Sequence, residues 1–204
     1  MKKLFSLLLL LCLLVICFAS CGNPELNGVK KSDAPTNYVL MNVKDYGDIL
    51  IELYPDVAPI TVANFKKLVS EKFYDGLTFH RVIEDFMIQG GNSSTKNPTT
   101  IKGEFSENGF DNPLKHERGV ISMARSNDPN SASGQFFIMH KASSSLDGRY
   151  AAFGKVLYGL DTVDKIATTE TTYNFYSGEK SVPQKKIVIN YVQFVTIDGS
   201  NFAK

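Results

Sequence analysis

Cysteine is nearly absent from this sequence. Its three cysteines, Cys12, Cys17 and Cys21, fall at the N-terminal end, and none follows as far as residue 204. We therefore expect no disulfide and no reactive thiol in the folded domain. No serine or cysteine stands in a motif that would pair it with a base, and the three histidines lack metal-ligand spacing. The sequence thus favours neither a hydrolase nor a metalloenzyme, and we expect no metal and no cofactor.

Charge of one sign is also lacking. The chain has 22 basic and 21 acidic side chains, and Lys2 and Lys3 supply two of the bases, which leaves 22 − 2 = 20 bases against 21 acids after residue 20. A domain this close to neutral has no electrostatic attraction for nucleic acid, so we predict no nucleic-acid partner. The length and the 43% of hydrophobic residues suffice for one core and one globular domain, which we expect to be a monomer.

A hydrophobic segment opens the chain. The basic pair Lys2 and Lys3 precedes an apolar run over residues 4–18, and small residues then lead to Cys21. The run is shorter than the ~20 residues that a membrane-spanning helix needs. This arrangement resembles a bacterial lipoprotein signal, in which the cysteine is acylated and becomes the first residue of the mature chain. We predict a signal peptide over residues 1–20 and lipidation of Cys21; the alternatives are an ordinary cleaved signal peptide and a retained anchor.

A polar segment follows the predicted lipidation site. Residues 21–36 contain Gly, Pro, Asn and charged residues without apolar periodicity, which predicts a flexible tether. A lipid on Cys21 would hold the protein on the outer face of the cell membrane, or on the periplasmic side in a cell with two membranes. The predicted folded domain then covers residues 37–200.

Short strand patterns dominate this domain. Alternating segments at 38–43 and 48–53 predict a hairpin, and Pro59 is typical of the first turn of a helix. A polar loop is predicted over residues 92–118. Many short strands without alternating helices favour a closed antiparallel barrel. The remaining predicted elements are strands at 77–83, 86–90, 119–123, 135–139, 151–157 and 187–197 and a helix at 160–167.

Three polar side chains interrupt the apolar strand patterns: Arg81, Gln89 and Gln135. A buried guanidinium or amide costs free energy unless its hydrogen bonds are used. Because residues i and i+2 share one face of a strand, Gln89 should point with Met87, and Gln135 with Phe137. Together these groups suit a site that grips a neutral amide. The alternative for either glutamine alone is that it satisfies the neighbouring backbone.

Seven ordered motifs carry a resemblance to a known family. They are TVANFKKL (61–68), FHRVI (79–83), FMIQGG (86–91), GVISMAR (119–125), GQFFI (134–138), LDG (146–148) and FGKV (153–156). Through them the sequence resembles the cyclophilin-type peptidyl-prolyl cis/trans isomerases over about residues 38–198. The resemblance implies a mainly β fold, an eight-stranded antiparallel β-barrel capped by two α-helices. It also implies an enzyme that accelerates rotation about the peptide bond before proline.

The resemblance further implies roles for single residues. Arg81 matches the catalytic arginine of the family, and Gln89 and Gln135 match residues that bind the substrate backbone or orient that arginine. Tyr150 stands where many eukaryotic members have histidine. The walls of the proline pocket are matched by Phe86, Met87, Phe137 and Leu146. The segment beside the residue before proline is matched by Ala124, Arg125 and Ser126.

Two rim positions depart from the common pattern of the family. Ser145 stands where many members have tryptophan, a residue that this chain lacks entirely, so we expect weak binding of cyclosporin. Arg125 stands where eukaryotic members commonly carry asparagine. We expect Arg125 either to tune which residue is preferred before proline or to point into solvent.

The predicted function is therefore an exported, lipid-anchored prolyl isomerase that assists the folding of exported proteins. Its expected partners are proline-containing segments of those polypeptides. The alternative is a non-catalytic proline-peptide binding module or chaperone that uses the same pocket. Retention of Arg81 favours the enzyme, because binding alone does not need an arginine.

Overall fold

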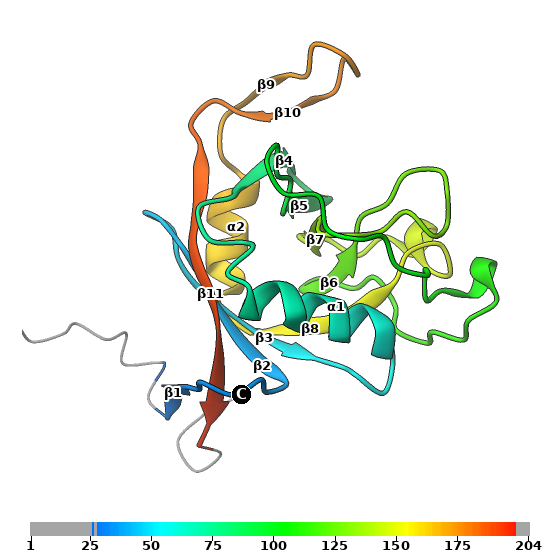
Figure 1. Ribbon diagram of the computed structural model, residues 1–204. Helices are drawn as coiled ribbons and strands as arrows, with labels where there is room; N and C mark the ends of the chain where they lie inside the picture. The colour runs from blue at the N-terminus through cyan, green and yellow to red at the C-terminus, as the bar shows by residue number, and fades with distance from the viewer. Residues whose placement is uncertain (1–25, 27, 199–204) are drawn as a thin grey trace, which may run out of the picture.

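The computed structural model describes residues 26 and 28–198, and the description below concerns these residues. Nine strands form one antiparallel sheet in the order β1-β11-β2-β3-β8-β6-β7-β5-β4, and β4 pairs in turn with β11. This last pairing closes eight strands into a barrel and leaves β1 outside it, so the predicted fold class is confirmed (Figure 1). The strands are β1 (Val29–Lys31), β2 (Tyr38–Val43), β3 (Gly47–Leu53), β4 (Thr78–Ile83), β5 (Met87–Gly90), β6 (Val120–Met123), β7 (Phe136–Met139), β8 (Ala152–Tyr158), β9 (Thr171–Tyr173), β10 (Lys180–Pro183) and β11 (Ile187–Ile197).

Two α-helices flank the barrel, α1 (Pro59–Ser70) and α2 (Leu160–Ala167), and two short 3-10 helices lie in its loops at Ser106–Asn108 and Ser144–Leu146. The predicted strands and helices agree with the observed ones to within about two residues at each end. They agree because the alternation of apolar and polar residues that predicts the strands also directs the apolar side chains into the barrel.

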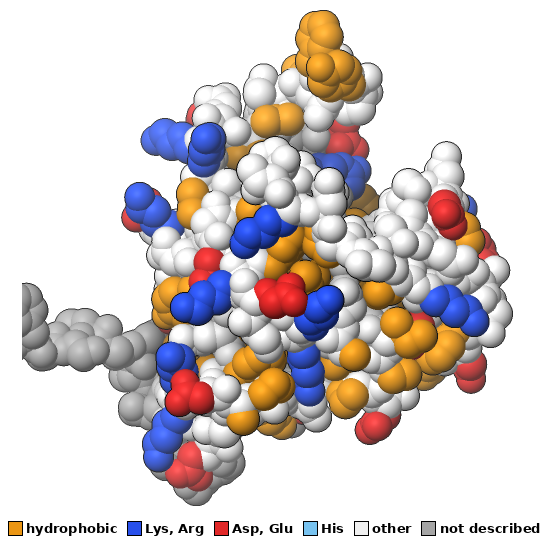
Figure 2. Space-filling model, viewed as in Figure 1, with side chains coloured by type: hydrophobic (Ala, Val, Ile, Leu, Met, Phe, Trp, Pro, Cys, Tyr) orange, Lys and Arg blue, Asp and Glu red, His pale blue; other side chains and the backbone are white. Residues whose placement is uncertain are grey.

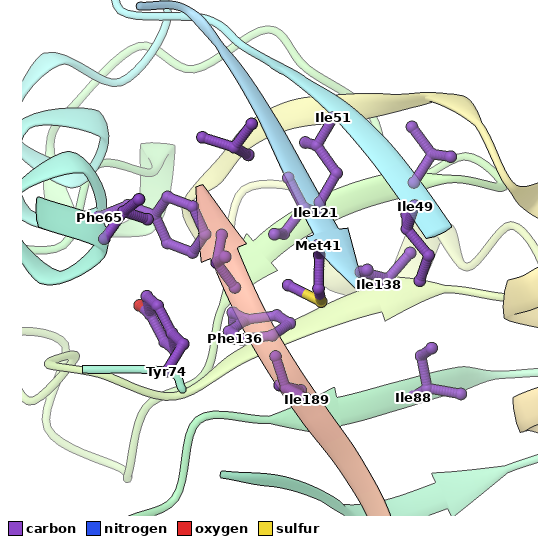
Figure 3. Close-up of a cluster of buried hydrophobic side chains, with 14 of the residues drawn as sticks. Met41, Ile49, Ile51, Phe65, Tyr74, Ile88, Ile121, Phe136, Ile138 and Ile189 are labelled. Carbon is purple, nitrogen blue, oxygen red and sulfur yellow. The ribbon is translucent and has the colours of Figure 1, made fainter. Parts of the chain in front are cut away.

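The core lies inside the barrel and under both helices. Figure 3 shows isoleucines from several strands, among them Ile49, Ile88 and Ile138, converging with the ring of Phe136. Phe65 of α1 reaches into this group, and its ring centroid lies 6.0 Å from that of Phe136 in an edge-on contact. All these side chains are fully buried. Burial at ~25 cal/mol per Å² of apolar surface makes this core the main source of stability.

Helix α1 begins without a capping side chain from its own N-cap residue. Instead, the carboxylate of Glu104 accepts hydrogen bonds from the backbone N–H groups of Ile60 (3.0 Å) and Thr61 (2.8 Å). Glu104 is fully buried, and a negative charge at a helix N-terminus is favourable. The predicted polar loop over residues 92–118 is therefore anchored to the helix at this point.

Two strand regions differ from the sequence-based expectation. Strand β1 lies inside the predicted tether, where Val29–Lys31 pairs with residues 195–197 of β11. The flexible tether therefore does not extend through these three residues, because their backbone groups bond to the edge of β11. The second region is the β9–β10 hairpin, a separate two-stranded sheet. Figure 1 shows this hairpin projecting from the barrel beyond β4.

The predicted signal peptide, residues 1–20, and the predicted lipidation site, Cys21, lie outside the described residues. Among the helices of residues 26 and 28–198, none combines the length and the apolar character needed to cross a membrane.

Candidate active site

A cavity of about 120 Å³ opens on the outside of the barrel. Its floor belongs to an apolar cluster separate from the barrel core. The structure thus brings together nine of the eleven site residues predicted from the sequence. Gln135 and Ser126 are the two that do not line the cavity. The lining residues are Arg81, Phe86, Met87, Gln89, Ala124, Arg125, Phe137, Leu146 and Tyr150.

The floor of the cavity comes from two neighbouring strands, β5 and β7. Their antiparallel register places Gln89 opposite Phe137 and Met87 opposite Met139. Met87 and Phe137 are almost completely buried, at 1% and 5% exposure. The pairing of Gln89 with Met87 on one strand face is therefore confirmed, and Phe136 on the adjacent position points into the core. A flat apolar floor of this kind suits the ring of a proline.

A buried histidine supports this floor from below. The ring of His116 stacks on Phe137 with 5.9 Å between ring centroids and an interplanar angle of 18°. Nε2 of His116 lies 3.0 Å from Oγ of Ser122, and Nδ1 lies 3.1 Å from Oδ1 of Asp147. Burial lowers the pKa of His116, an effect that the hydrogen bond with Asp147 partly opposes. The ring is thus held in one orientation under the floor.

This serine–histidine–aspartate chain corrects one expectation from the sequence. No nucleophile paired with a base was expected, and Ser122, His116 and Asp147 are arranged as such a set. Ser122 is nevertheless fully buried and His116 is 2% exposed, so no substrate carbonyl can reach the hydroxyl. The three side chains therefore form a buried hydrogen-bonded chain that holds the His116 ring against Phe137.

Arg81 enters the cavity from β4 and is held by a chain of amides. Its Nη1 donates to Oε1 of Gln89 at 3.3 Å and lies 3.8 Å from the sulfur of Met87. Nε2 of Gln89 donates to Oε1 of Gln135 at 3.0 Å. Gln135 therefore acts on the cavity through Gln89 rather than lining it. The alternative, in which either glutamine only satisfies the neighbouring backbone, is therefore wrong for both.

A carboxylate that was not predicted holds the other edge of Arg81. Glu179, directly before β10, accepts hydrogen bonds from Nε and Nη2 of Arg81, both at 2.7 Å. The hydrogen bond from Arg81 lowers the pKa of Glu179. The sequence has a hairpin signal here, TTY and KSVP on either side of a turn with Asn174 and Gly178. Nothing in that signal indicates that Glu179 would meet a residue 98 positions earlier.

Loop residues make the rim of the cavity. The guanidinium carbon of Arg125 lies 4.7 Å from the ring centroid of Tyr150 and 5.0 Å from that of Phe105. Its Nε donates to the backbone oxygen of Arg149 at 2.9 Å. Arg125 is therefore clamped between two rings at the cavity edge and does not simply extend into solvent. Tyr150 in turn meets Phe137 edge-on at 5.7 Å.

Two further residues near the cavity differ from simple expectation. The hydroxyl of Ser126 donates to Oγ of Ser131 at 2.8 Å, so it folds back onto its own loop. His80 would face away from Arg81 in a regular strand, but the β4–β5 register shifts between Phe79 and Arg81. Burial lowers the pKa of His80, and hydrogen bonding with the backbone of Thr78 and, to a smaller extent, with the side chain of Gln135 opposes this shift. His80 therefore belongs to the surroundings of the amide chain.

The family model described as "Cyclophilin type peptidyl-prolyl cis-trans isomerase/CLD" matches residues 38–193, which span the whole barrel except the end of β11. The chain belongs to the cyclophilin family. Like the family, it is a peptidyl-prolyl cis/trans isomerase. The eleven positions named above lie within the matched range.

Curated relatives and solved structures agree. A peptidyl-prolyl cis-trans isomerase of Acinetobacter baylyi is 41% identical over 157 residues, covering 74% of this chain and 82% of the relative. Peptidyl-prolyl cis-trans isomerase B of Bacillus subtilis is 48% identical over 130 residues, covering 62% and 86%. A cyclophilin of Cryptosporidium parvum, crystallised in the presence of the dipeptide Ala-Pro, superposes with a TM-score of 0.65 at 27% identity, covering 77% of this chain and 98% of that one. In the described part of this cyclophilin, no cluster of three or more His, Cys, Asp and Glu side chains could hold a metal ion.

Proposed function

We propose that this cyclophilin rotates the bond before proline by seating the proline ring on Met87 and Phe137 while Arg81 donates to the twisted amide. Resonance gives the C–N bond double-bond character and a barrier of ~18–20 kcal/mol. Twisting the bond makes the nitrogen pyramidal and gives it a lone pair. A donor placed there stabilises the twisted state more than the planar one, which is the condition for catalysis.

The observation that carries this proposal is the position of Nη1 of Arg81. It lies beside Met87 and Gln89, two residues that line the cavity above its apolar floor. An arginine suits the task because its planar fork stays charged and can be held at one corner while it donates from another. Uncatalysed isomerisation takes tens of seconds. Turnover in milliseconds requires the rate to rise by about four decades, which corresponds to lowering the barrier by roughly 5–6 kcal/mol. The arginine donor, the apolar floor and the contacts that hold the substrate chain must supply this together.

The test is the replacement Arg81→Ala. We expect the rate of cis/trans exchange of an Ala-Pro peptide, measured by NMR, to fall by ~10²–10³, as is usual when one preorganised donor is lost. Chemical unfolding should show an intact fold. Arg149→Ala is the matched control: its side chain pairs with Glu107 on the surface at 3.4 Å, and its exchange rate should stay at the wild-type value. A near wild-type rate in Arg81→Ala would refute this role for the arginine and favour the binding-module alternative.

We further propose that the domain works outside the cytoplasm, anchored through a lipid on Cys21, as a monomer that assists the folding of exported proteins. The support is the basic pair, the apolar run over residues 4–18 and the small residues before Cys21. The proposed substrates are proline-containing segments of exported polypeptides. The Ala-Pro dipeptide in the Cryptosporidium parvum crystals supports this substrate class.

The anchor is tested separately from the activity. Cys21→Ser should release the protein from the membrane fraction or leave it unprocessed, while the isomerase activity of the domain is unchanged. Mass spectrometry of the native N-terminus should find an acylated Cys21 as the first residue. An unmodified chain that starts at any other residue would contradict the lipoprotein proposal without affecting the proposed role of Arg81.

A further inference from the structure

The β9–β10 hairpin is joined to the cavity through one residue. Glu179 lies where the hairpin turn enters β10, and its backbone is fixed by a hydrogen bond from the N–H of Asn174 to its carbonyl (2.7 Å). The backbone N–H of Glu179 also donates to Oγ of Ser177 at 3.3 Å. Ser181 is 1% exposed. The carboxylate is therefore presented by an ordered turn rather than by a free loop.

The hydrogen bonds of Arg81 divide between Glu179 on one edge and Gln89 with Met87 at the opposite corner. A guanidinium has five N–H groups in a rigid plane. Glu179 accepts from Nε and Nη2 at 2.7 Å each, which is the two-bond arrangement that fixes a guanidinium plane. Gln89 accepts from Nη1 alone at 3.3 Å. Without Glu179, the guanidinium would keep only the longer contacts of Nη1 with Gln89 and Met87 and the contact with the ring of Phe86, 5.9 Å from its centroid.

The carboxylate holds Arg81 from behind and does not fill the cavity. Neither Glu179 nor any residue of β9 or β10 is among the residues that line it. The Nε–Nη2 edge faces the hairpin, and Nη1 is the corner that lies by Met87 and Gln89. Pairing with Glu179 thus leaves the cavity open and aims the remaining donor at it.

We propose that Glu179 is a positioning residue for Arg81 and that the role of the β9–β10 hairpin is to hold Glu179 beside this arginine. The inference rests on the proposed role of Arg81. The carboxylate sets the plane of the guanidinium, so Nη1 is already directed at the amide when a substrate arrives. Preorganisation of this kind acts on the catalytic step, because a small misplacement of a donor can cost up to ~10²-fold in rate.

The Arg81–Glu179 ion pair contributes little to the free energy of unfolding. The two side chains are 34% and 36% exposed, and ion pairs that share their surroundings with water contribute little to stability. Replacement of Glu179 should therefore leave the midpoint of unfolding close to that of the wild type. This separates a positioning role from a structural one.

The experiment compares Glu179→Ala and Glu179→Gln with Glu84→Ala. Glu84 is an exposed carboxylate in the turn directly after β4, so its removal changes the net charge equally without touching the Arg81–Glu179 pair. Exchange of an Ala-Pro peptide is followed by NMR at several peptide concentrations to separate kcat from KM. The ¹⁵N–¹H signal of Arg81 Nε reports whether the guanidinium is held.

For Glu179→Ala we expect kcat to fall about tenfold with KM unchanged, and the Arg81 Nε signal to broaden or vanish. Glu179→Gln should lie between this variant and the wild type, because its amide oxygen can accept one of the two bonds. Glu84→Ala should match the wild type. In an Arg81→Ala background, Glu179→Ala should cause no further loss, since the residue acts only through the arginine.

Three results would overturn the inference. A wild-type kcat in Glu179→Ala, with Arg81→Ala inactive, would show that Arg81 acts without the carboxylate. A faster Glu179→Ala would show that the pair restrains the arginine. A full activity in Arg81→Ala would remove the proposed function first and the positioning role with it.

Discussion

The floor and the rim of the cavity are built in different ways. Met87 and Phe137 lie on paired strands, are almost wholly buried and rest on a second buried layer around His116. Arg125 lies in a loop, Arg81 is tied to a hairpin outside the barrel, and their contacts are polar and partly exposed. The difference implies that the floor residues contribute to both the stability of the fold and the activity, whereas the rim residues contribute to the activity alone. Each of the following predictions tests that separation.

Phe137→Ala should have the largest effect. Loss of a buried aromatic side chain typically costs ~3–5 kcal/mol of unfolding free energy, and the proline ring would lose its floor. We expect both a lower midpoint in urea and a strongly reduced exchange rate for an Ala-Pro peptide. Leu146→Ala, a half-buried rim residue, serves as the comparison and should lose activity with a much smaller change in stability. If the two variants lose the same amount of unfolding free energy, the predicted difference between floor and rim is wrong.

Acid should weaken the floor through His116. Burial lowers the pKa of this histidine below its ordinary value of 6.5, so the unfolded chain binds a proton more readily than the folded one. The unfolding free energy should therefore be constant above about pH 6.5 and should decrease as the pH falls from there through the folded pKa. Urea unfolding at a series of pH values measures this decrease. Because burial also lowers the pKa of His80, NMR titration of each ring is needed to divide the effect, and a His116 ring that titrates at or above pH 6.5 would contradict the prediction.

Ser145→Trp should strengthen cyclosporin binding without changing stability. Ser145 is exposed in the 3-10 helix Ser144–Leu146, directly before the cavity-lining Leu146. A tryptophan there adds a ring face and an N–H donor, worth about 0.5–1.5 kcal/mol beyond the buried area. Calorimetric titration of wild type and variant measures the change. Tight binding by the wild type, unaltered by the substitution, would show that the rim position does not govern the ligand.

Arg125→Asn should have the smallest effect. The guanidinium at the cavity edge should favour an acidic residue before proline by only ~0–1 kcal/mol, and salt should screen the preference. The measurement is the ratio of exchange rates of Glu-Pro and Lys-Pro peptides at low and high salt, in wild type and variant. If this ratio is the same in all four conditions, the arginine only clamps the rings of Phe105 and Tyr150.

The floor could be predicted from the sequence because its causes are local. Alternation along two short strands places Met87 with Gln89 and separates Phe137 from Phe136, and the cyclophilin motifs lie in those same strands. The barrel follows from the same alternation repeated along the chain. Strand β1 was missed because three residues of VKK carry no apolar pattern and are ordered only by the edge of β11.

The rim could not be predicted in the same way, because its contacts join distant segments. Glu179 meets Arg81 across 98 positions, and Glu104 caps a helix that begins 45 residues earlier, at Pro59. Each carboxylate looks like an ordinary surface acid in the sequence. Likewise, nothing in the spacing of Ser122, His116 and Asp147 indicates that the three would form one buried chain.

The hydrophobic tip of the hairpin adds to this contrast. Phe175 and Tyr176, in the turn between β9 and β10, are 93% and 95% exposed. Figure 2 shows hydrophobic surface at the top of the molecule, where Figure 1 shows the β9–β10 hairpin projecting. Residues so exposed contribute nothing to the core. The hairpin therefore draws its order from its base, where Glu179 and Ser181 lie, rather than from its tip.

The closure of the barrel has a consequence for the order in which the chain can fold. Strand β11 pairs with β1, β2 and β4, and it is the last strand of the described residues. Until residues 187–197 have been synthesised, β2 and β4 each present a row of unpaired backbone groups, the kind of edge along which chains aggregate. Pairings this distant in sequence also form slowly. The barrel therefore cannot close until β11 has been synthesised, and the edges of β2 and β4 stay open until then.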